Sequence, residues 1–479
     1  MKITIEDFGP VSRFEFDTDV DFHLIVGENN VGKSYALSAF YSVLKAMDSV
    51  SHNPSFMHYF SGLFWGDAES EAMKDKPELN TRPKEDYDVQ SYFEFVAKVV
   101  FDESFAQVFS ENVKATYSEI SSISNQFSGG RSRITISSGD FFIVLSGDID
   151  GFEVEKVSYA KRVIVRPVKT NRTPRYQGEK YVVYLNKAVR SSDIYSEVNQ
   201  ACAKQLLKFF GDVGRKISAV HYLPASRSGL YQALSAFGQI IAQLSQSRSM
   251  LTQKVELPGI SQQLSDYFIK LSNIVVSNEA KNKSMEGIAA AIEKEVLKGD
   301  IEFDESDKRI YYKPVNTDLK LDLSVTSSMV SEVAPIVAYI RHILSNPPTN
   351  FFSRRFRSQK NRPPLRQVII IEEPEAHLHP RNQIKMTKLY SELAKAGVVV
   401  VMTSHSNYVF NKLSNIVISG GLDTDQVKCD LFSMTGYGGV GEPQGIDRLG
   451  IDDQNFVDAG EALLEEKLDL FSKMENSND

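Results

Sequence analysis

The residues best suited to chemistry near the start of the chain form one stretch, Gly27-Glu28-Asn29-Asn30-Val31-Gly32-Lys33-Ser34. The stretch matches G-x-x-x-x-G-K-[ST], the P-loop pattern that binds nucleotide phosphates. Its two glycines permit backbone torsions that a side chain would forbid, so the loop N–H groups can converge on phosphate oxygens. We expect Lys33 to reach the β- and γ-phosphates of ATP and the Ser34 hydroxyl to bind Mg²⁺. Tyr35 follows directly and is included in the predicted nucleotide site.

The sequence on either side of this stretch favours phosphate binding over a chance glycine-rich turn. Residues 22–26 are a short apolar run typical of a buried strand, and residues 34–47 are apolar at helical spacing. The loop would therefore join a strand to the start of a helix. A helix N-terminus adds its positive dipole end to the site.

A second set of polar residues follows two more predicted strands. Residues 367–371 have four β-branched apolar residues in five and are followed by Glu372 and Glu373. Residues 398–402 are similar and are followed by Thr403-Ser404-His405. Strands that alternate with helices form parallel sheets, which bind ligands at the carboxyl ends of their strands. We therefore expect the P-loop, the two acids and the histidine to meet in one crevice.

These residue types predict ATP hydrolysis. Glu372 would hold Mg²⁺ through water, opposite Ser34, and Glu373 would polarise the water that attacks the γ-phosphate. His405 would bond the γ-phosphate or hold that water. The predicted catalytic residues are thus Glu373, His405 and Lys33, and the predicted metal ligands are Ser34 and Glu372. The alternative is that the acids only cap a strand and that the histidine is inert.

Composition sets outer limits on function. The chain has 479 residues, 42% of them hydrophobic and 24% charged, and a net charge of −8. This balance argues against a generally basic nucleic-acid coat protein, although not against a local basic groove. Cys202 and Cys429 are far apart and have no metal-type spacing. We find no signal peptide and no apolar run long enough to span a bilayer, and we predict a cytoplasmic protein without a membrane partner.

The order of patterns predicts five segments. Residues 1–50 form the N-terminal half of an ATPase head, beginning with a hairpin. Residues 51–130 form a small helical insertion, 131–225 an antiparallel β region that completes a lobe, and 226–300 a helical lobe. Residues 301–479 form the C-terminal half of the head and end in an acidic helix, which we expect to pack through its Leu and Phe face. Basic runs at 161–175 and at Arg354–Arg366 predict either solvated loops or nucleic-acid contacts.

Three motifs together resemble the ABC-type ATPases of the SMC, RecF and "overcoming lysogenization defect" (OLD) group. They are Gly27–Ser34, Ile370–Pro380 (Ile-Ile-Glu-Glu-Pro-Glu-Ala-His-Leu-His-Pro) and Thr403–Ser406. The Glu-Pro-Glu-Ala-His-Leu-His-Pro form and Tyr222–Arg227 resemble the OLD-like branch, which is common in bacterial anti-phage systems. The resemblance implies an α/β fold. It would be a P-loop ABC-type ATPase head with a mixed or parallel core sheet, an antiparallel β subdomain and a helical insertion lobe.

The resemblance also implies roles for particular residues. Glu372 and Glu373 would be the Walker B pair, Glu375–Pro380 a D-loop and His405 the switch histidine. Two subunits would form a head-to-head homodimer, possibly within a higher oligomer, with two ATP molecules between the P-loop of one subunit and the signature motif of the other.

Two motifs of the family pattern are missing from the sequence. No Leu-Ser-Gly-Gly occurs. Its candidate counterpart is Ser324–Glu332, in which Ser327 and Ser328 would reach the nucleotide of the partner; the alternative is a plain N-cap. No Q-loop is evident, and Arg227 is either a sensor or part of a structural salt bridge.

OLD proteins carry a C-terminal TOPRIM nuclease domain, whereas here only residues 406–479 follow the histidine. Asp423-Thr424-Asp425 has the acidic spacing of that nuclease but is interpreted as a turn. The chain therefore resembles stand-alone ATPases that work with a separate nuclease or toxin, as in the PARIS and Septu systems. Such an ATPase would respond to a phage protein or nucleic acid. The alternative is an ATP-dependent DNA-binding repair protein close to RecF; a transporter subunit is disfavoured by the long stretch between residues 51 and 320.

Overall fold

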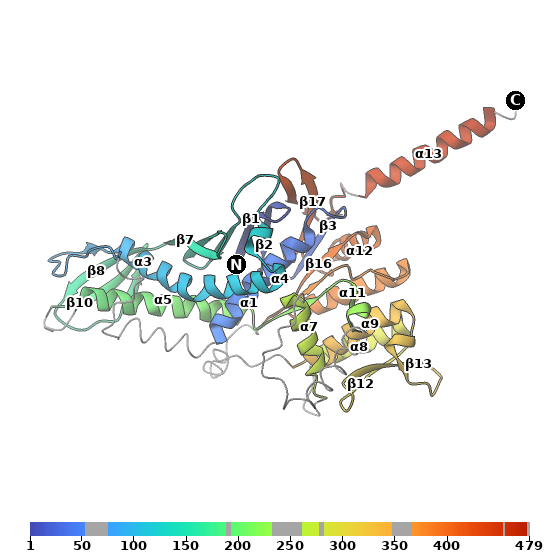
Figure 1. Cartoon of the computed structure of the whole chain (residues 1–479), viewed down its shortest axis with the longest axis horizontal. Coiled ribbons are helices and arrows are strands. Elements are labelled where there is room, and N and C mark those ends of the chain that lie inside the picture. The colour runs from blue at the N-terminus through green and yellow to red at the C-terminus, as the bar shows by residue number, and fades with distance from the viewer. Residues whose placement is uncertain are drawn as a thin grey trace, which may run out of the picture.

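A mixed sheet, with 11 strands among the described residues, runs through the protein in the order β11-β15-β16-β3-β17-β18-β2-β1-β5-β6-β7 (Figure 1). The structure is a computed structural model that describes residues 1–52, 75–187, 193–231, 261–276, 282–346, 366–453 and 456–476. The sheet joins the N-terminal strands to strands from the last quarter of the chain.

One half of the sheet is parallel, as the β-branched runs predict. Its strands are β11 (Ala219–Leu223), β15 (Gln367–Ile371), β16 (Val398–Ser404), β3 (Phe22–Gly27) and β17 (Val427–Thr435). Every residue of β11, β15, β16 and β3 is buried, which is typical of strands covered on both faces. Because β16 lies between β15 and β3, the ends of these three strands are neighbours.

The other half is mainly antiparallel. β18 (Gly438–Pro443) pairs antiparallel with β17 and parallel with β2 (Val11–Asp17). β2 forms the predicted hairpin with β1 (Lys2–Phe8), and the sheet continues through β5 (Arg133–Ser138), β6 (Phe141–Gly147) and β7 (Phe152–Tyr159). The last part of the predicted C-terminal half of the head, residues 427–443, therefore contributes two strands to the main sheet.

The two faces of the sheet carry separate hydrophobic cores. Val368 and Ile370 of β15 point into one core and Ile369 and Ile371 into the other, following the period of two of a strand. The first core is completed by α1 (Lys33–His52), α3 (Gln90–Phe101), α4 (Gln107–Tyr117) and α5 (Ile194–Lys216). The second is completed by α7 (Gln262–Ser272), α8 (Lys283–Ile292), α9 (Ser328–Ala338), α11 (Pro380–Lys395) and α12 (Asn407–Ile418).

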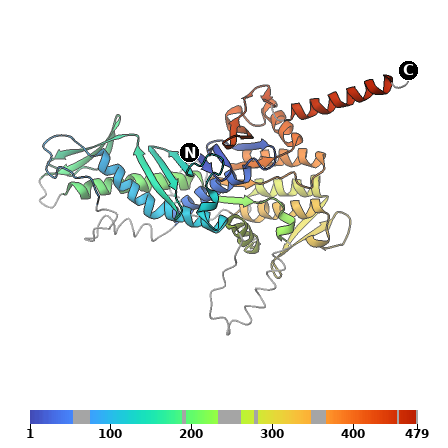
Figure 2. The ribbon, with the colours of Figure 1, turned by 45° about the horizontal axis from the view of Figure 1, so that its top comes forward.

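The antiparallel β region predicted at 131–225 is right for the pairing of β5 to β7 and wrong for the pairing of β8 with β10. β8 (Arg162–Val168) and β10 (Lys180–Asn186) pair in parallel, within a separate sheet of order β4-β8-β10-β9 that also contains β4 (Tyr87–Asp88) and β9 (Arg175–Gln177). This small sheet lies at one end of the molecule, and β12 (Gly299–Asp304), β13 (Arg309–Pro314) and β14 (Leu321–Asp322) lie at the other (Figures 1 and 2).

Acidic neighbours neutralise part of the basic run at 161–175. Arg162 Nε lies 2.7 Å from Asp88 Oδ2, Arg166 Nη2 lies 2.6 Å from Asp86 Oδ2, and Lys161 Nζ lies 2.7 Å from Glu179 Oε2. These pairs favour the interpretation of a solvated loop face over a phosphate-binding patch. In the second basic run, Arg354 to Arg362 lie outside the described residues.

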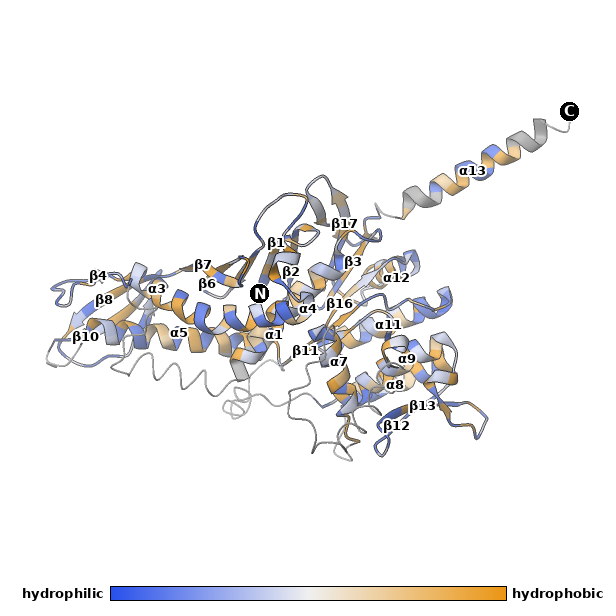
Figure 3. Ribbon diagram, in the orientation of Figure 1, coloured by the Kyte–Doolittle hydropathy of each residue, from blue (hydrophilic) through white to orange (hydrophobic). Residues whose placement is uncertain are grey.

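The expected packing of the C-terminal helix is wrong. α13 (Val457–Asn476) projects away from the described body of the protein in both views (Figures 1 and 2). Its large apolar side chains are exposed: Leu463 by 68%, Leu468 by 58% and Phe471 by 52%. Figure 3 shows that hydrophobic positions recur along the projecting helix α13. The helical spacing predicts the helix itself, whereas burial of its apolar face needs a complementary surface, which the described part of this chain does not place there.

Across the described ranges, no helix combines the length and the apolar character that a bilayer crossing requires. The helical lobe predicted at 226–300 is described only in part, by α7 and α8. The five domain boundaries stay predictions.

Candidate nucleotide-binding site

The predicted P-loop lies between β3, which ends at Gly27, and α1, which begins at Lys33. Gly27 and Gly32 have φ values of +142° and +104°, which L side chains rarely adopt. A Cβ at Gly27 would lie 2.2 Å from the Phe432 carbonyl oxygen of β17. Glu28, Asn29 and Asn30 are exposed, as is Ser34 in the first turn of α1, while Val31 is buried. The loop thus presents its polar edge to solvent at the N-terminus of a 20-residue helix.

Lys33 is 6% exposed, and its ammonium group bonds the loop itself. Nζ donates to the Gly27 carbonyl at 3.0 Å and also to the Glu28 carbonyl. Burial lowers the pKa of Lys33 to about 8, while the negative charges of Glu373 and Glu375 oppose that shift. A phosphate oxygen could therefore replace a carbonyl as the acceptor of this buried ammonium group.

This pKa predicts a pH dependence of ATP binding. The ammonium form binds phosphate, so affinity should be greatest below pH 8 and should fall up to about tenfold per pH unit above it. Fluorescence titration with a labelled ATP between pH 7.5 and 9.5 measures this slope. In Lys33→Arg the slope should vanish because a guanidinium keeps its charge over this range. A wild-type affinity that stays constant to pH 9.5 would contradict the assignment of Lys33.

The β17–β18 hairpin packs against the P-loop, and a glycine of β18 makes this close contact possible. A Cβ at Gly439 would lie 1.9 Å from the Val31 carbonyl oxygen. Gly439→Ala must therefore push the P-loop out of place, and overpacking of this kind costs about 1–3 kcal/mol of stability. We expect a lower melting temperature and weaker ATP binding, as measured by calorimetry and titration. Gly436→Ala is the matched control because nothing lies within 4 Å of its Cβ position; equal effects of the two changes would refute the contact.

Glu372 is anchored at the end of β15 and keeps one oxygen free for a ligand. Its backbone N–H donates to the Leu223 carbonyl at 2.9 Å, and its Oε2 accepts from the Ala225 N–H at 3.3 Å. Its Oε1 is buried and has no hydrogen-bond partner in the described structure. A buried carboxylate oxygen without a donor is costly unless a ligand satisfies it. Such an oxygen suits a water molecule of hydrated Mg²⁺, so the residues fit the predicted cation, with Ser34 as the other ligand.

Glu373 and His405 lie next to each other. His405 Nε2 is 3.5 Å from Glu373 Oε1, and the Glu373 N–H donates to Thr403 Oγ1 at 3.3 Å. The hydrogen bond with His405 lowers the pKa of Glu373, with the charges of His405 and Lys33 adding to the shift. Glu373 is therefore a carboxylate at neutral pH, the form that accepts a proton from water. Its φ of 41° is unusual for a residue other than glycine, and such strain is concentrated at functional sites.

A comparison with known protein families identifies the family of this chain. Residues 1–410 match the AAA_15 family, described as an AAA ATPase domain. The chain belongs to the AAA_15 family. Membership of this family of ATPase domains supports nucleotide binding and ATP hydrolysis. A comparison with curated proteins gives no match.

Solved structures similar to this AAA_15 chain include heads of SMC proteins. One is the SMC head bound to the C-winged helix domain of ScpA, at 10% identity and a TM-score of 0.37, covering 93% of this chain and 98% of the other. A second is the SMC head domain from Thermotoga maritima, at 10% identity and a TM-score of 0.32, with coverages of 93% and 98%. At these TM-scores the likeness carries no argument about function.

Arg227 of the AAA_15 chain forms a structural bridge. Its side chain is fully buried and pairs with Glu332 of α9 at 3.3 Å. Its guanidinium donates to the backbone carbonyls of Glu372, at 2.8 Å, and Glu373, at 3.3 Å. The sequence left open whether Arg227 is a sensor or part of a structural salt bridge. These contacts match the salt bridge. Sequence reasoning missed Glu332, for which the only signal was a single charge within an otherwise apolar helix.

Ser327 and Ser328 lie at the exposed N-terminus of α9. The Ser327 hydroxyl accepts a hydrogen bond from the Val330 N–H at 3.4 Å. Ser327 therefore caps the helix, which is the alternative to a signature motif that the sequence left open. In the described structure no hydrogen bond joins these serines to the P-loop of the same chain. The helix end remains open to solvent, and its role towards a partner subunit stays a prediction.

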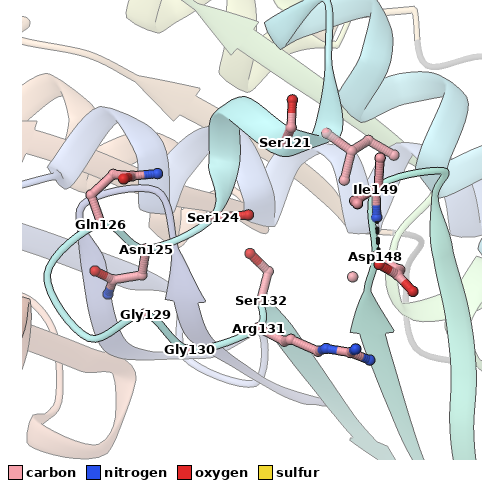
Figure 4. A pocket seen from close by; sticks show the side chains of 12 residues that line it. Ser121, Ser124, Asn125, Gln126, Gly129, Gly130, Arg131, Ser132, Asp148 and Ile149 are labelled. Carbon is pink, nitrogen blue, oxygen red and sulfur yellow. Dashed lines mark hydrogen bonds between the residues drawn. The ribbon is translucent and has the colours of Figure 1, made fainter.

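A surface pocket of about 270 Å³ lies beside loop 120–132 and turn 147–149 (Figure 4). It contains none of the predicted site residues of this AAA_15 chain. Asn125 in its wall accepts from the Phe127 N–H at 2.8 Å and donates to Asp7 Oδ1 at 3.2 Å. These bonds hold the loop beside the β1–β2 hairpin, so we assign Asn125 a structural role.

Proposed function

We propose that this protein binds and hydrolyses ATP in the crevice at the carboxyl ends of β3, β15 and β16. The observation that carries the proposal is the meeting of three side-chain types at adjacent strand ends: the buried ammonium of Lys33, the carboxylate of Glu373 and the imidazole of His405. Loop N–H groups and Lys33 bind the phosphates, and Ser34 and Glu372 hold Mg²⁺.

In the proposed reaction, Glu373 accepts the proton of the attacking water, because its carboxylate is ionised and partly exposed. His405, hydrogen-bonded to Glu373, holds the water or the γ-phosphate in line. When bound, Mg²⁺ supplies positive charge that stabilises the charge developing on the phosphate oxygens. Lys33 supplies a fixed positive charge on the other side of the transferred phosphoryl group.

The open N-terminus of α9 supports a homodimer. Ser327 and Ser328 are exposed, and the buried Arg227–Glu332 pair couples their helix to the Walker B turn. In the proposed dimer these serines contact the nucleotide held by the partner, so each ATP lies between two subunits. Formation of the closed dimer would then depend on ATP. Several such dimers could associate into a higher oligomer.

We further propose that the dimer is the sensor and scaffold subunit of a prokaryotic anti-phage system. The OLD-like form of Glu373–Pro380 supports this branch of the family. After α12 the described residues form the short 3₁₀ turn η8 (Thr424–Gln426), β17, β18, a two-stranded sheet (β19, Ile446–Asp447, and β20, Gly450–Ile451) and α13. Asp423 begins this 3₁₀ turn and does not follow a buried strand. In the proposed system a separate nuclease or toxin is the effector, and a phage protein or nucleic acid is the trigger.

The experiment is co-purification of the chain with the product of a neighbouring gene in its native operon. A nuclease or toxin that co-elutes with the wild type, and whose release depends on ATP and trigger, supports the proposal. DNA affinity that falls steeply with salt, and is abolished by the change of Arg354, Arg355 and Arg357 to Ala, supports the RecF-like alternative instead. In the same basic run, Arg366 lies among the described residues and already bonds Asp21 and the Val20 carbonyl, so it is not free for phosphate.

A further inference from the structure

Glu375 has an unassigned role beside the catalytic pair. It lies two residues beyond Glu373, and one of its oxygens accepts two hydrogen bonds from the segment that carries the switch histidine. Oε1 accepts from the backbone N–H of His405 at 2.6 Å and from Ser404 Oγ at 2.8 Å. Oε2 is buried and has no partner in the described structure. The carboxylate thus points at the backbone of residues 404–405 and not into open solvent.

These bonds fix the backbone of residues 404–405, where the switch histidine lies. Hydrogen bonds to a carboxylate are shorter and stronger than bonds between neutral groups. Ser404 Oγ also accepts from the Ser406 N–H at 3.0 Å, so the backbone on both sides of His405 is tied to one small network. The imidazole can reach Glu373 only if this backbone stays in place.

A second bridge joins the same two segments on the far side of His405. Ser406 Oγ donates to Gln383 Oε1 at 2.5 Å, and Gln383 Nε2 donates to the Leu378 carbonyl at 2.8 Å. Residues 375–383 therefore hold residues 404–406 at two points, one before and one after the histidine. A movement of the first segment would carry His405 with it.

We propose that Glu375 is a positioning residue that holds His405 in line with Glu373 and couples the predicted D-loop to the switch histidine. The proposal rests on the proposed ATPase function. Glu375 acts through His405: its Oε1 is already occupied by two donors, whereas the side chains of Glu373 and His405 are 44% and 28% exposed to solvent.

The test compares steady-state ATP turnover and ATP affinity in five variants: Glu375→Ala, Glu375→Gln, His405→Ala, the double variant Glu375→Ala/His405→Ala, and Glu392→Ala. The last is the matched control, a partly exposed glutamate of α11 that pairs with Lys395. Glu375→Ala should lower kcat on the order of 10²-fold, the effect of a misplaced catalytic group, with ATP affinity changed less than about twofold. Glu375→Gln keeps an acceptor oxygen and should retain most of the activity. The double variant should be no slower than His405→Ala.

Several results would overturn the proposal. Wild-type turnover in Glu375→Ala would mean that the contact is irrelevant. A Glu375→Gln variant as inactive as Glu373→Gln would place the charge of Glu375 in the chemistry itself. Independent, multiplicative losses in the double variant would show that Glu375 does not act through His405.

A second measurement separates this proposal from the proposed function. In nucleotide-free protein, the His405 ring resonance, assigned by its loss in His405→Ala, should shift in Glu375→Ala and stay unchanged in Glu392→Ala. An unmoved resonance refutes the positioning role whether or not the protein hydrolyses ATP. If the resonance shifts in Glu375→Ala but the wild-type protein never turns over ATP, only the proposed function is refuted.

Discussion

Glu373→Gln is expected to stop ATP hydrolysis while ATP binding persists. The amide preserves the shape of the side chain but cannot accept a proton from water. Loss of a general base lowers kcat by about 10²–10⁴-fold. The substitution leaves Lys33, Ser34 and the loop N–H groups unchanged, so affinity should remain within a few-fold of the wild type. Rapid-quench turnover and fluorescence titration measure the two quantities separately.

The same variant tests the dimer. If two subunits enclose ATP, blocked hydrolysis should hold them closed, and Glu373→Gln with Mg²⁺ and ATP should elute at twice the monomer mass in light-scattering chromatography. Without nucleotide it should elute like the wild type under the same conditions. If it stays monomeric with saturating ATP, the sandwich arrangement and the assignment of Ser327 and Ser328 are wrong.

Lys33→Ala is expected to weaken ATP binding strongly. A hydrogen bond to a charged group contributes about 1.5–3 kcal/mol, which corresponds to a loss of affinity between roughly tenfold and 150-fold. Because Lys33 also satisfies the Gly27 and Glu28 carbonyls, the variant needs a melting curve beside the binding titration. Lys395→Ala on the surface of α11 controls for the loss of a lysine. Unchanged affinity in a folded Lys33→Ala variant would remove this residue from the site.

The grouping of the site residues at one edge of the sheet was predictable because its determinants are local in sequence. Runs such as Val368–Ile371 and Val398–Met402 are too apolar for half-exposed strands, so they had to lie in the interior of a parallel sheet. Once the strands are parallel, the residues after them share one edge. The structure brings Lys33, Glu373 and His405 together at that edge.

What could not be predicted depends on contacts between distant segments. The parallel pairing of β8 with β10 is absent from the local pattern, which resembles that of an antiparallel meander. The Arg227–Glu332 pair joins residues 105 positions apart. The hydrogen bond from the His405 N–H to Glu375 likewise depends on how two separate loops are placed relative to each other. The exposed face of α13 shows the same limit, because amphipathic spacing predicts a helix and says nothing about what covers it.

The most direct measurement is a crystal or cryo-electron microscopy structure of Glu373→Gln with Mg²⁺ and ATP. The account predicts the γ-phosphate within hydrogen-bond distance of the Lys33 ammonium, the cation beside Ser34 and Glu372, and residues 373 and 405 on the far side of the phosphate. Nucleotide bound elsewhere, or bound at the P-loop with Glu372, residue 373 and His405 remote from its phosphates, would contradict the account.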